Sequence, residues 1–391
     1  MIMAADKQDK VLNVPNLRFP EFNGEWVKYR VSDVLDFYST NSLSWDQLEY
    51  NTDELQNLHY GLIHVGLPTV VNLDENVLPN IKKEFLPKNY ELCREGDVAF
   101  ADASEDTNEV AKAIEFVNLS DKNVVCGLHT IHGRDNHNLT SIGFKGYSFA
   151  SESFHNQIRR IAQGTKIFSI SSKNFNECYM GIPSKDEQTK IAKLLALIDE
   201  RISTQSRIID KLQSLMKGLA EHLTAFTPNT KIADCLNCHS SILQENQVKN
   251  EGKYKVYGAN GICGYNDSPA ILEDAILIVK DGSGVGNVSY ASGEYSVIGT
   301  SNYLTAKSGY SLKYLYFCLM IFNFVPYRTG VAIPHIYFKD YGKALIPCPS
   351  LNRQKQIATL LSKIECKIET EKTITESYLQ QKRFLLKSMF I

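Results

Sequence analysis

The chain has 391 residues, of which 43% are hydrophobic and 22% charged, a composition typical of a globular protein with about two or three domains. It contains no run of about 18 apolar residues, and the polar start Met1–Lys10 lacks the apolar core of a signal peptide. We therefore expect a cytoplasmic protein without a membrane span. The net charge of −2 lacks the basic excess of an autonomous DNA-binding protein. The chain either does not bind DNA or binds it within a complex whose other subunits supply positive charge.

Short strands and helices alternate in both halves of the chain, which predicts mixed α/β domains. Apolar runs bounded by polar residues indicate the strands, and longer amphipathic stretches indicate the helices. In chain order we expect strand Asp97–Ala101, strand Ala111–Val117, helix Ser151–Ala162, strand Ala275–Lys280, strand Tyr295–Ala306 and helix Leu312–Phe324.

An internal repeat relates the two halves. Gly164–Lys173 aligns with Gly330–Lys339 at a spacing of 166 residues. The same spacing continues without a gap through the pairs Pro183 and Pro349, Ser184 and Ser350, Gln188 and Gln354, Ile191 and Ile357, Leu195 and Leu361, Ile198 and Ile364, and Ile202 and Ile368. Two copies indicate a duplicated domain rather than a solenoid, which needs at least three repeats.

Each copy of the repeat leads into a long predicted helix. Pro183 and Pro349 end the preceding extended segment, and Ser184 and Ser350 are good N-caps. The residues expected to face a partner helix, which we call seam residues, then recur at alternating spacings of four and three. This is the heptad pattern of a coiled coil. The seam positions are Ile191, Leu195, Ile198, Ile202, Gln205, Ile209, Leu212, Met216, Leu219 and Leu223 in the first helix, and Ile357, Leu361, Ile364, Ile368, Glu371, Thr375, Tyr378, Lys382, Leu385 and Met389 in the second.

Pairing the two seams antiparallel would bury both and would give the chain an approximate internal two-fold axis. The predicted order is a first α/β domain over 1–184, a helix over 185–226, a second α/β domain over 227–349 and a helix over 350–391. Two domains held apart by helices suit a two-part DNA target, with the gap set by helix length. The alternative is two amphipathic helices that pack on separate cores.

Two cysteine patterns suggest other functions. Cys235, Cys238 and His239 form a CxxCH sequence of the kind used for covalent haem attachment. That chemistry needs export and a second axial ligand, and zinc binding by Cys235, Cys238 and Cys263 would lack a matching second pair of ligands. We expect neither site, and we interpret the nine cysteines as free thiols.

Other motifs that suggest catalysis are also weak. Gly282–Asn287 follows an apolar run like a nucleotide loop, but a β-like segment follows it, so we expect a strand–turn–strand unit. No Asn-Pro-Pro-aromatic tetrapeptide is present, which argues against methyl transfer by this chain. For Asp274 and nearby carboxylates we expect turn capping rather than nuclease chemistry, and for His129 and His132 a surface or loop position.

Several sequence segments together resemble those of the DNA-specificity subunits of type I restriction–modification systems. They are Val14–Trp26, Tyr254–Gly261, Ile276–Asn287, Pro183–Gln188 and Pro349–Gln354. The resemblance covers nearly the whole chain except Met1–Lys10. It implies two target recognition domains that read two short sequences in double-stranded DNA, and paired helices that dock two methyltransferase subunits, with restriction–translocase subunits joining them.

The resemblance also implies a non-catalytic chain without a cofactor of its own. S-adenosylmethionine, ATP and magnesium would then belong to the partner subunits. Two alternatives stay open: the specificity subunit of a related combined restriction–methylation system outside type I, and a coiled-coil scaffold without DNA contact.

Polar and basic residues close to the repeat are the candidates for DNA contact. Arginine and asparagine read guanine and adenine edges, whereas lysine mainly holds phosphate. The matched Lys173 and Lys339 are therefore expected to hold phosphate, and unmatched positions to read bases. The candidates are Arg159, Arg160, Gln163, Lys166, Ser172 and Lys173 in the first half, and Lys280, Ser283, Asn287, Asn302, Tyr327, Arg328, His335, Tyr337 and Lys339 in the second.

Overall fold

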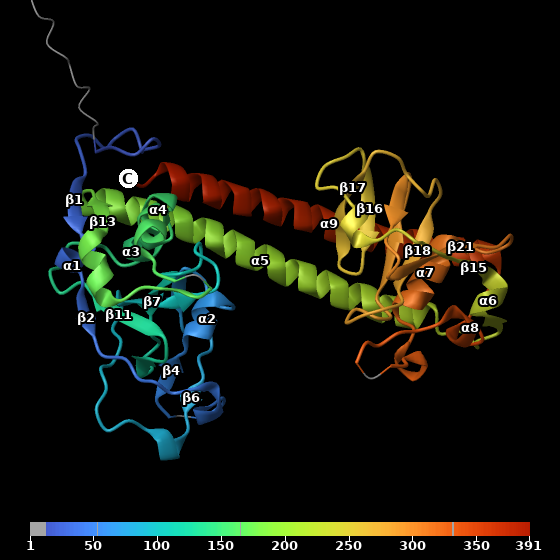
Figure 1. Ribbon diagram of the computed structural model, residues 1–391, viewed down its shortest axis with the longest axis horizontal. Helices are drawn as coiled ribbons and strands as arrows, with labels where there is room; N and C mark the ends of the chain where they lie inside the picture. The colour runs from blue at the N-terminus through green and yellow to red at the C-terminus, as the bar shows by residue number, and fades with distance from the viewer. Residues whose placement is uncertain (1–12, 53, 165, 331) are drawn as a thin grey trace, which may run out of the picture. The chain divides into compact units, whose positions relative to one another are not determined.

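The computed structural model describes residues 13–52, 54–164, 166–330 and 332–391, which form two compact units (Figure 1). Unit 1 extends to Gln205 and includes the final segment Ile374–Ile391, and unit 2 is Ser206–Thr373. The polar start Met1–Lys10 and the repeat residues Thr165 and Val331 lie outside the described residues. Across the described ranges, no helix has both the length and the apolar character needed to cross a bilayer.

A five-stranded sheet forms the centre of unit 1 and is buried on both faces. In its central strand, Val98 and Phe100 join one core cluster, and Ala99 and Ala101 join another, because successive side chains of a strand point to opposite faces. Helices and the start of the first long helix cover the Val98 face. The sheet order is β2 (Asp36–Tyr38), β11 (Thr130–Arg134), β7 (Val98–Ala101), β9 (Ala113–Asn118) and β5 (Val70–Asn72).

Smaller elements complete unit 1. A second sheet has the order β10 (Val124–Cys126), β4 (Gln56–Leu58), β6 (Asn80–Ile81) and β3 (Leu48–Glu49), and two strand pairs join β1 (Val27–Arg30) to β13 (Tyr179–Ile182) and β8 (Ala103–Ser104) to β12 (Phe168–Ser169). The short helices are α1 (Val31–Val34), α2 (Tyr60–His64), α3 (Phe144–Phe149) and α4 (Glu152–Ile161).

Unit 2 repeats this plan in smaller form. In its central strand, Ile276 and Ile278 face the helix side, and Ala275 and Leu277 face a three-stranded sheet. The sheets have the orders β15 (Leu236–Ser240), β21 (Ser301–Ala306), β18 (Ala275–Val279), β19 (Val288–Ala291), and β17 (Gly261–Asn266), β16 (Tyr254–Gly258), β20 (Tyr295–Val297). The strand pair β14 (Thr230–Lys231) and β22 (Leu345–Ile346) and the helices α6 (Ile232–Cys235), α7 (Leu312–Met320) and α8 (Phe338–Tyr341) complete it.

The mixed α/β class is confirmed, and two element predictions are wrong. The predicted strand Tyr295–Ala306 is two strands, β20 and β21, which belong to different sheets. The chain changes sheets at Gly299, whose N–H donates to the carbonyl of Leu243. The predicted helix Leu312–Phe324 stops at Met320, after which Phe324 packs against Tyr341.

The two long helices, α5 (Lys185–Leu223) and α9 (Leu351–Ser388), begin directly after the predicted serine caps. In unit 1 the start of α5 packs with the end of α9, where Asp199 forms an ion pair with Lys382 at 2.6 Å. In unit 2 the end of α5 packs with the start of α9, where Ala220 and Leu361 share one core. The helices are therefore paired antiparallel, as predicted, and the alternative of separate cores is wrong. The first helix ends at Leu223 rather than at residue 226.

A matched glutamine anchors the start of each long helix. Gln188 accepts from the N–H of Ser141 (2.7 Å) and donates to the carbonyl of Pro183 (2.9 Å). Gln354 accepts from the N–H of Ser311 (2.9 Å) and donates to the carbonyl of Pro349 (2.8 Å). Both side chains are buried. The repeat identified in the sequence is thus a repeated joint between helix and domain.

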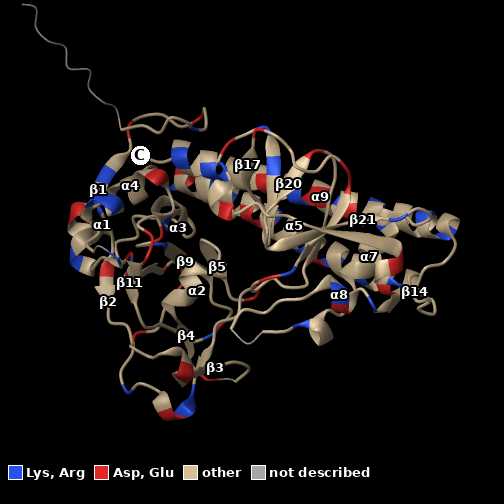
Figure 2. Ribbon diagram, turned by 45° about the vertical axis from the view of Figure 1, so that its right-hand side comes forward, with Lys and Arg blue, Asp and Glu red and all other residues tan. Residues whose placement is uncertain are grey.

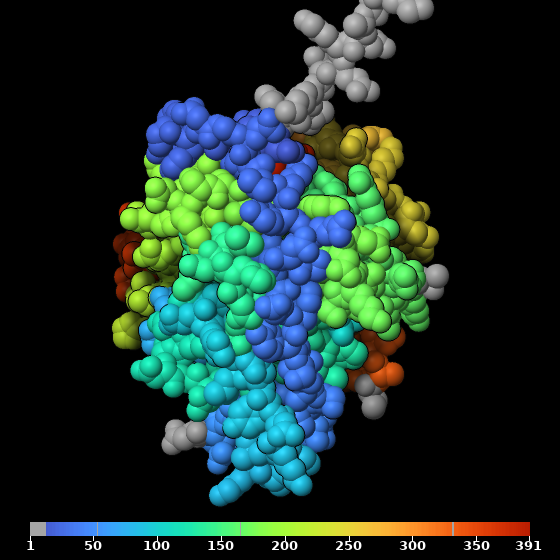
Figure 3. Space-filling view, turned by 90° about the vertical axis from the view of Figure 1, so that its left-hand side faces the viewer, coloured from blue at the N-terminus to red at the C-terminus, as the bar shows by residue number. Residues whose placement is uncertain are grey.

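Hydrogen bonds join the N-terminal segment Val14–Trp26 to the start of α5. Arg18 donates from Nε and Nη2 to the two carboxylate oxygens of Glu187 at 2.7 and 2.8 Å, and the indole N–H of Trp26 donates to the same carboxylate at 3.3 Å. Glu187 is buried, so the bidentate arginine compensates a charge that would be costly to leave unpaired. Figure 3 shows the blue N-terminal segment as a continuous band across this face of unit 1.

Asp135, in the loop between β11 and α3, should contribute less to the stability of the chain at low pH. Burial acts to raise the pKa of Asp135, but hydrogen bonds from Thr140 and from the backbone of Leu139 hold that pKa below its usual value. A lowered pKa adds stability above the unfolded-state value, and this contribution is lost as the pH falls through the folded-state value. We expect the difference in unfolding free energy between the native chain and Asp135→Asn to shrink from pH 7 toward pH 3. A constant difference in denaturant titrations across that range would contradict this assignment.

Candidate nucleic-acid interface

The same small hairpin occurs in both units, at the repeat spacing of 166 residues. In unit 1, Gln163 and Ser169 exchange two backbone hydrogen bonds of 3.1 and 2.8 Å. In unit 2, Thr329 and His335 exchange two of 2.8 Å. Each hairpin also bonds to the loop after the central strand: the N–H of Ile170 donates to the backbone carbonyl of Asp102, and the N–H of Ile336 donates to that of Lys280, both at 2.9 Å.

A glycine is needed at the turn of each hairpin. Gly164 and Gly330 have φ values of +138° and +88°, a region that L-residues with a side chain rarely adopt. A Cβ at these positions would lie 1.9 Å from the carbonyl oxygen of Ile167 and 2.3 Å from that of Ile333, respectively. These contacts are too short for any other residue, which explains why the sequence repeats glycine here.

In unit 2 the hairpin brings most of the predicted DNA-contact residues together. The N–H of Gly282 donates to the carbonyl of Pro334 at 3.0 Å, and Arg328 Nη2 donates to the carbonyl of Val285 at 2.9 Å. The loop 280–287 and the segment 328–339 therefore form one surface, which we call surface 2. It carries the candidates Lys280, Ser283, Asn287, Arg328, His335, Tyr337 and Lys339.

Surface 2 places a lysine and a histidine beside an exposed tyrosine ring. Lys339 Nζ lies 5.2 Å from the centre of the exposed Tyr337 ring, and His335 packs edge-on against the same ring with centroids 5.1 Å apart. Such a group can stack on a base and hold a phosphate. His335 Nδ1 also lies 3.1 Å from the carbonyl oxygen of Ile333, which stabilises the hairpin.

Two further candidates in unit 2 make packing contacts. Asn302 is a buried residue of β21, and its side-chain oxygen accepts a hydrogen bond from Ser240 at 2.8 Å. The ring of Tyr327 stacks on Phe322 with centroids 5.8 Å apart. The burial of Asn302 depends on a partner distant in sequence, whereas Tyr327 is half-buried against a residue of its own segment.

Unit 1 has an equivalent surface, which we call surface 1, at the end of α4 and along its hairpin. Arg159 and Arg160 occupy the last turn of α4 and are exposed. Arg159 Nη1 donates to Asn108 Oδ1 at 2.5 Å. The remaining candidates, Gln163, Lys166, Ser172 and Lys173, follow along the hairpin and the 3-10 helix after it.

Sequence reasoning missed the loop 102–109 of surface 1. Like the loop 280–287, it follows the central strand of its unit and bonds to the hairpin. It carries Asp102, Glu105, Asp106 and Glu109, and carboxylates can accept from the amino group of cytosine. The sequence could have indicated this loop, because a run of polar residues follows an apolar strand there. The two loops differ strongly in charge.

The competing motifs have structural roles. Cys235 ends α6, and its thiol donates to the carbonyl of Ile232, whereas His239 lies in β15, stacked on Tyr303 and 3.1 Å from Thr305 Oγ1. Asp274 accepts from the N–H of Gly293 in a turn, as expected. The loop Gly282–Asn287 joins the antiparallel strands β18 and β19, which confirms the strand–turn–strand interpretation.

One histidine prediction is wrong. His129 is exposed beside Asp102, but His132 is fully buried in β11 and bonds to Asp97. The strand at Thr130–Arg134 contains few apolar residues, so its burial was not visible in the sequence.

Comparisons with known proteins agree on one family. Residues 230–377 match the family model described as type I restriction modification DNA specificity domain. A putative type I specificity subunit of Mycoplasma genitalium is 28% identical over 197 residues, which are 45% of this chain and 50% of that relative. The match thus spans about half the length of that relative.

Solved structures share the fold. The crystal structure of a type I restriction–modification system S subunit from M. genitalium matches with a TM-score of 0.60 and 18% identity, covering 97% of this chain and 99% of the other. A chain from a study of complex assembly and conformational transition of the type I system matches with a TM-score of 0.53 and 14% identity, over 92% of this chain and 96% of the other. Taken with the duplicated domains and paired helices, these matches show that the chain shares the fold of type I S subunits and that residues 230–377 are similar to their DNA specificity domain.

Proposed function

We propose that this chain is the DNA-specificity subunit of a type I restriction–modification complex. Surface 1 and surface 2 would each read one part of a two-part target in double-stranded DNA. The observation that carries the proposal is the repeated glycine hairpin, which ties a polar loop to basic residues in both units. Because the two surfaces share a backbone frame but differ in side chains, they suit two different short sequences.

The paired helices would dock the partner subunits. Leu197 and Leu215 of α5 and Leu360 and Phe384 of α9 are about half exposed or more, and exposed apolar residues on a helix favour protein contacts. Two methyltransferase subunits and the restriction–translocase subunits are the proposed partners. S-adenosylmethionine, ATP and magnesium would be bound by them, and this chain would be non-catalytic and cytoplasmic.

The charge distribution fits a reader that works within a complex. Figure 2 shows basic and acidic residues interspersed along α9, and the net charge is −2. Positive charge on the partners would therefore supply part of the attraction for the DNA backbone. A related system outside type I would use the same surfaces with different partners, whereas a scaffold would need neither surface.

The variant Arg160→Ala with Arg328→Ala tests whether DNA is read. We expect the assembled complex to lose target-specific methylation, because both surfaces lose a side chain suited to bind base edges or phosphate. Co-purification with the methyltransferase subunits should persist, since neither arginine lies on the long helices. Full methylation activity in the double variant would favour the scaffold alternative.

The matched lysines give a separate, quantitative prediction. For each of Lys173→Ala and Lys339→Ala, the slope of log affinity against log salt should fall by about 0.9, the value for one phosphate contact. The exposed Lys372, which forms an ion pair with Glu369 on α9, supplies the control Lys372→Ala, whose slope should match the native complex. Unchanged slopes in both test variants would show that neither lysine contacts a phosphate.

A further inference from the structure

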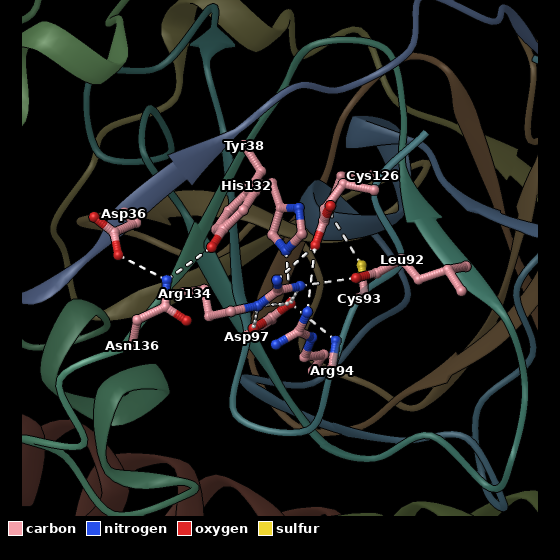
Figure 4. A network of polar contacts seen from close by, with 11 residues as sticks. Asp36, Tyr38, Leu92, Cys93, Arg94, Asp97, Cys126, His132, Arg134 and Asn136 are labelled. Carbon is pink, nitrogen blue, oxygen red and sulfur yellow. Dashed lines mark hydrogen bonds and ion pairs between the residues drawn. The ribbon is translucent and has the colours of Figure 1, made fainter. Parts of the chain in front are cut away.

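A buried polar network in unit 1 lies apart from surface 1. His132 Nε2 bonds to Asp97 Oδ2 at 2.7 Å, and Arg134 donates to both oxygens of the same carboxylate at 2.8–3.2 Å (Figure 4). Arg134 also bonds to Glu91 and the carbonyl of Leu92. The charge of Asp97 is therefore compensated inside the unit.

Two thiols lie next to this network. Cys93 and Cys126 have their sulfurs 3.6 Å apart, and both side chains are buried. Together with His132 they place three metal-ligand atoms within 4.8 Å of one another. In a tetrahedral zinc site with Zn–S bonds of about 2.3 Å, two sulfurs lie about 3.8 Å apart. The thiol pair has close to that spacing.

The second nitrogen of His132 supplies an independent observation. Nδ1 is buried and has no hydrogen-bond partner among the described residues, an unfavourable state for a polar atom. Since Asp97 accepts a hydrogen bond from Nε2–H, the neutral ring carries its lone pair on Nδ1. A carboxylate that fixes the tautomer of a ligand histidine is the usual support of a zinc site.

We propose that Cys93 Sγ, Cys126 Sγ and His132 Nδ1 bind a thiolate-seeking divalent cation, zinc by preference. Sulfur and imidazole ligands select zinc over calcium or magnesium. Binding would release the two thiol protons to solvent, and a water molecule would complete four ligands.

The cation would link separate parts of unit 1. Cys126 belongs to β10 of the four-stranded sheet, and His132 belongs to β11 of the five-stranded sheet. Cys93 precedes β7 and is held beside β10 by its N–H bond to Val124. A metal here would fix the two sheets of the first recognition domain to each other, away from the DNA-reading loops.

The test measures metal in the purified full chain, kept reduced with a non-thiol reductant. We expect about one zinc per chain by elemental analysis, and cobalt titration should give the thiolate-to-cobalt charge-transfer absorption. Cys93→Ser and Cys126→Ser should each lose that absorption. The control Cys178→Ser removes another buried thiol of the same unit and should retain both signals.

If a variant does not fold, measurements on the native chain alone still decide the question. Removal of zinc by a chelator should lower the melting temperature of the native chain and of Cys178→Ser, because a ligand that binds only the folded state stabilises it. A reduced native chain that holds no zinc and gives no cobalt charge-transfer band would overturn the proposal. So would a disulfide between Cys93 and Cys126 that forms in preference to metal binding.

Discussion

Replacing Gly330 with alanine should lower the specific DNA affinity of the assembled complex by about tenfold or more. The backbone at φ +88° costs a residue with a side chain roughly 1–2 kcal/mol, and the added Cβ would lie 2.3 Å from the carbonyl of Ile333. The hairpin must open to relieve this contact, which separates the loop 280–287 from Arg328 and His335. Since about 1.4 kcal/mol corresponds to a factor of ten, loss of even one base contact adds to the effect.

Gly293 provides the matched control. Its φ is +82°, but a Cβ there meets nothing within 4 Å. Gly293→Ala therefore carries similar backbone strain without the collision, and it should bind the target like the native complex. Fluorescence anisotropy with specific and unrelated duplexes measures both affinities. Equal losses in the two variants would mean that general destabilisation, not the hairpin, governs binding.

The second large effect is on stability. Gln354→Ala should reduce the unfolding free energy by about 2 kcal/mol or more, because it removes partners from the N–H of Ser311 and the carbonyl of Pro349. Gln354 is 2% exposed. The control Gln356→Ala changes an exposed glutamine on the same turn of α9 and should cost less than about 0.5 kcal/mol.

The equivalent substitution in unit 1, Gln188→Ala, should have a similar effect. Because the two glutamines belong to different units, their costs should add in the double variant. Denaturant titrations of the four chains measure this. A cost for Gln354→Ala no larger than that for Gln356→Ala would show that the glutamine joint does not hold the helix to its domain.

The long helices could be predicted because their signals are local. A serine cap, the absence of proline and a heptad seam together fixed where α5 and α9 begin, and the 166-residue repeat indicated that they are equivalent. The seam residues of α5 are most buried near its start, where Ile191 and Leu195 also meet the domain core, and only half-buried in its middle.

The sheets could be predicted only in part. Strands buried on both faces, such as β7 and β18, stand out as apolar runs. The four-stranded sheet of unit 1 is built from strands of two or three residues, too short to show a period. The division of β20 from β21 depends on which sheet each strand joins, which is a non-local property.

The candidate DNA interface, like the sheets, could be predicted only in part. The candidates around Lys280 and Arg328 were chosen as polar and basic residues, and the structure brings them together through the hairpin. The burial of Asn302 could not be predicted from local pattern, because its partner Ser240 is distant in sequence. The cluster of Cys93, Cys126 and His132 has no recognisable spacing in the sequence, since its members come together only through sheet pairing.

A methylome comparison tests the central claim most directly. A host that carries the methyltransferase and restriction subunits should be sequenced for methyladenine with this chain, without it, and with Gly330→Ala. We predict that one sequence with two specified parts and a fixed unspecified gap is methylated only in the presence of the native chain, and that its methylation falls sharply with Gly330→Ala. Identical methylation patterns with and without the chain would contradict the assignment of DNA reading to it.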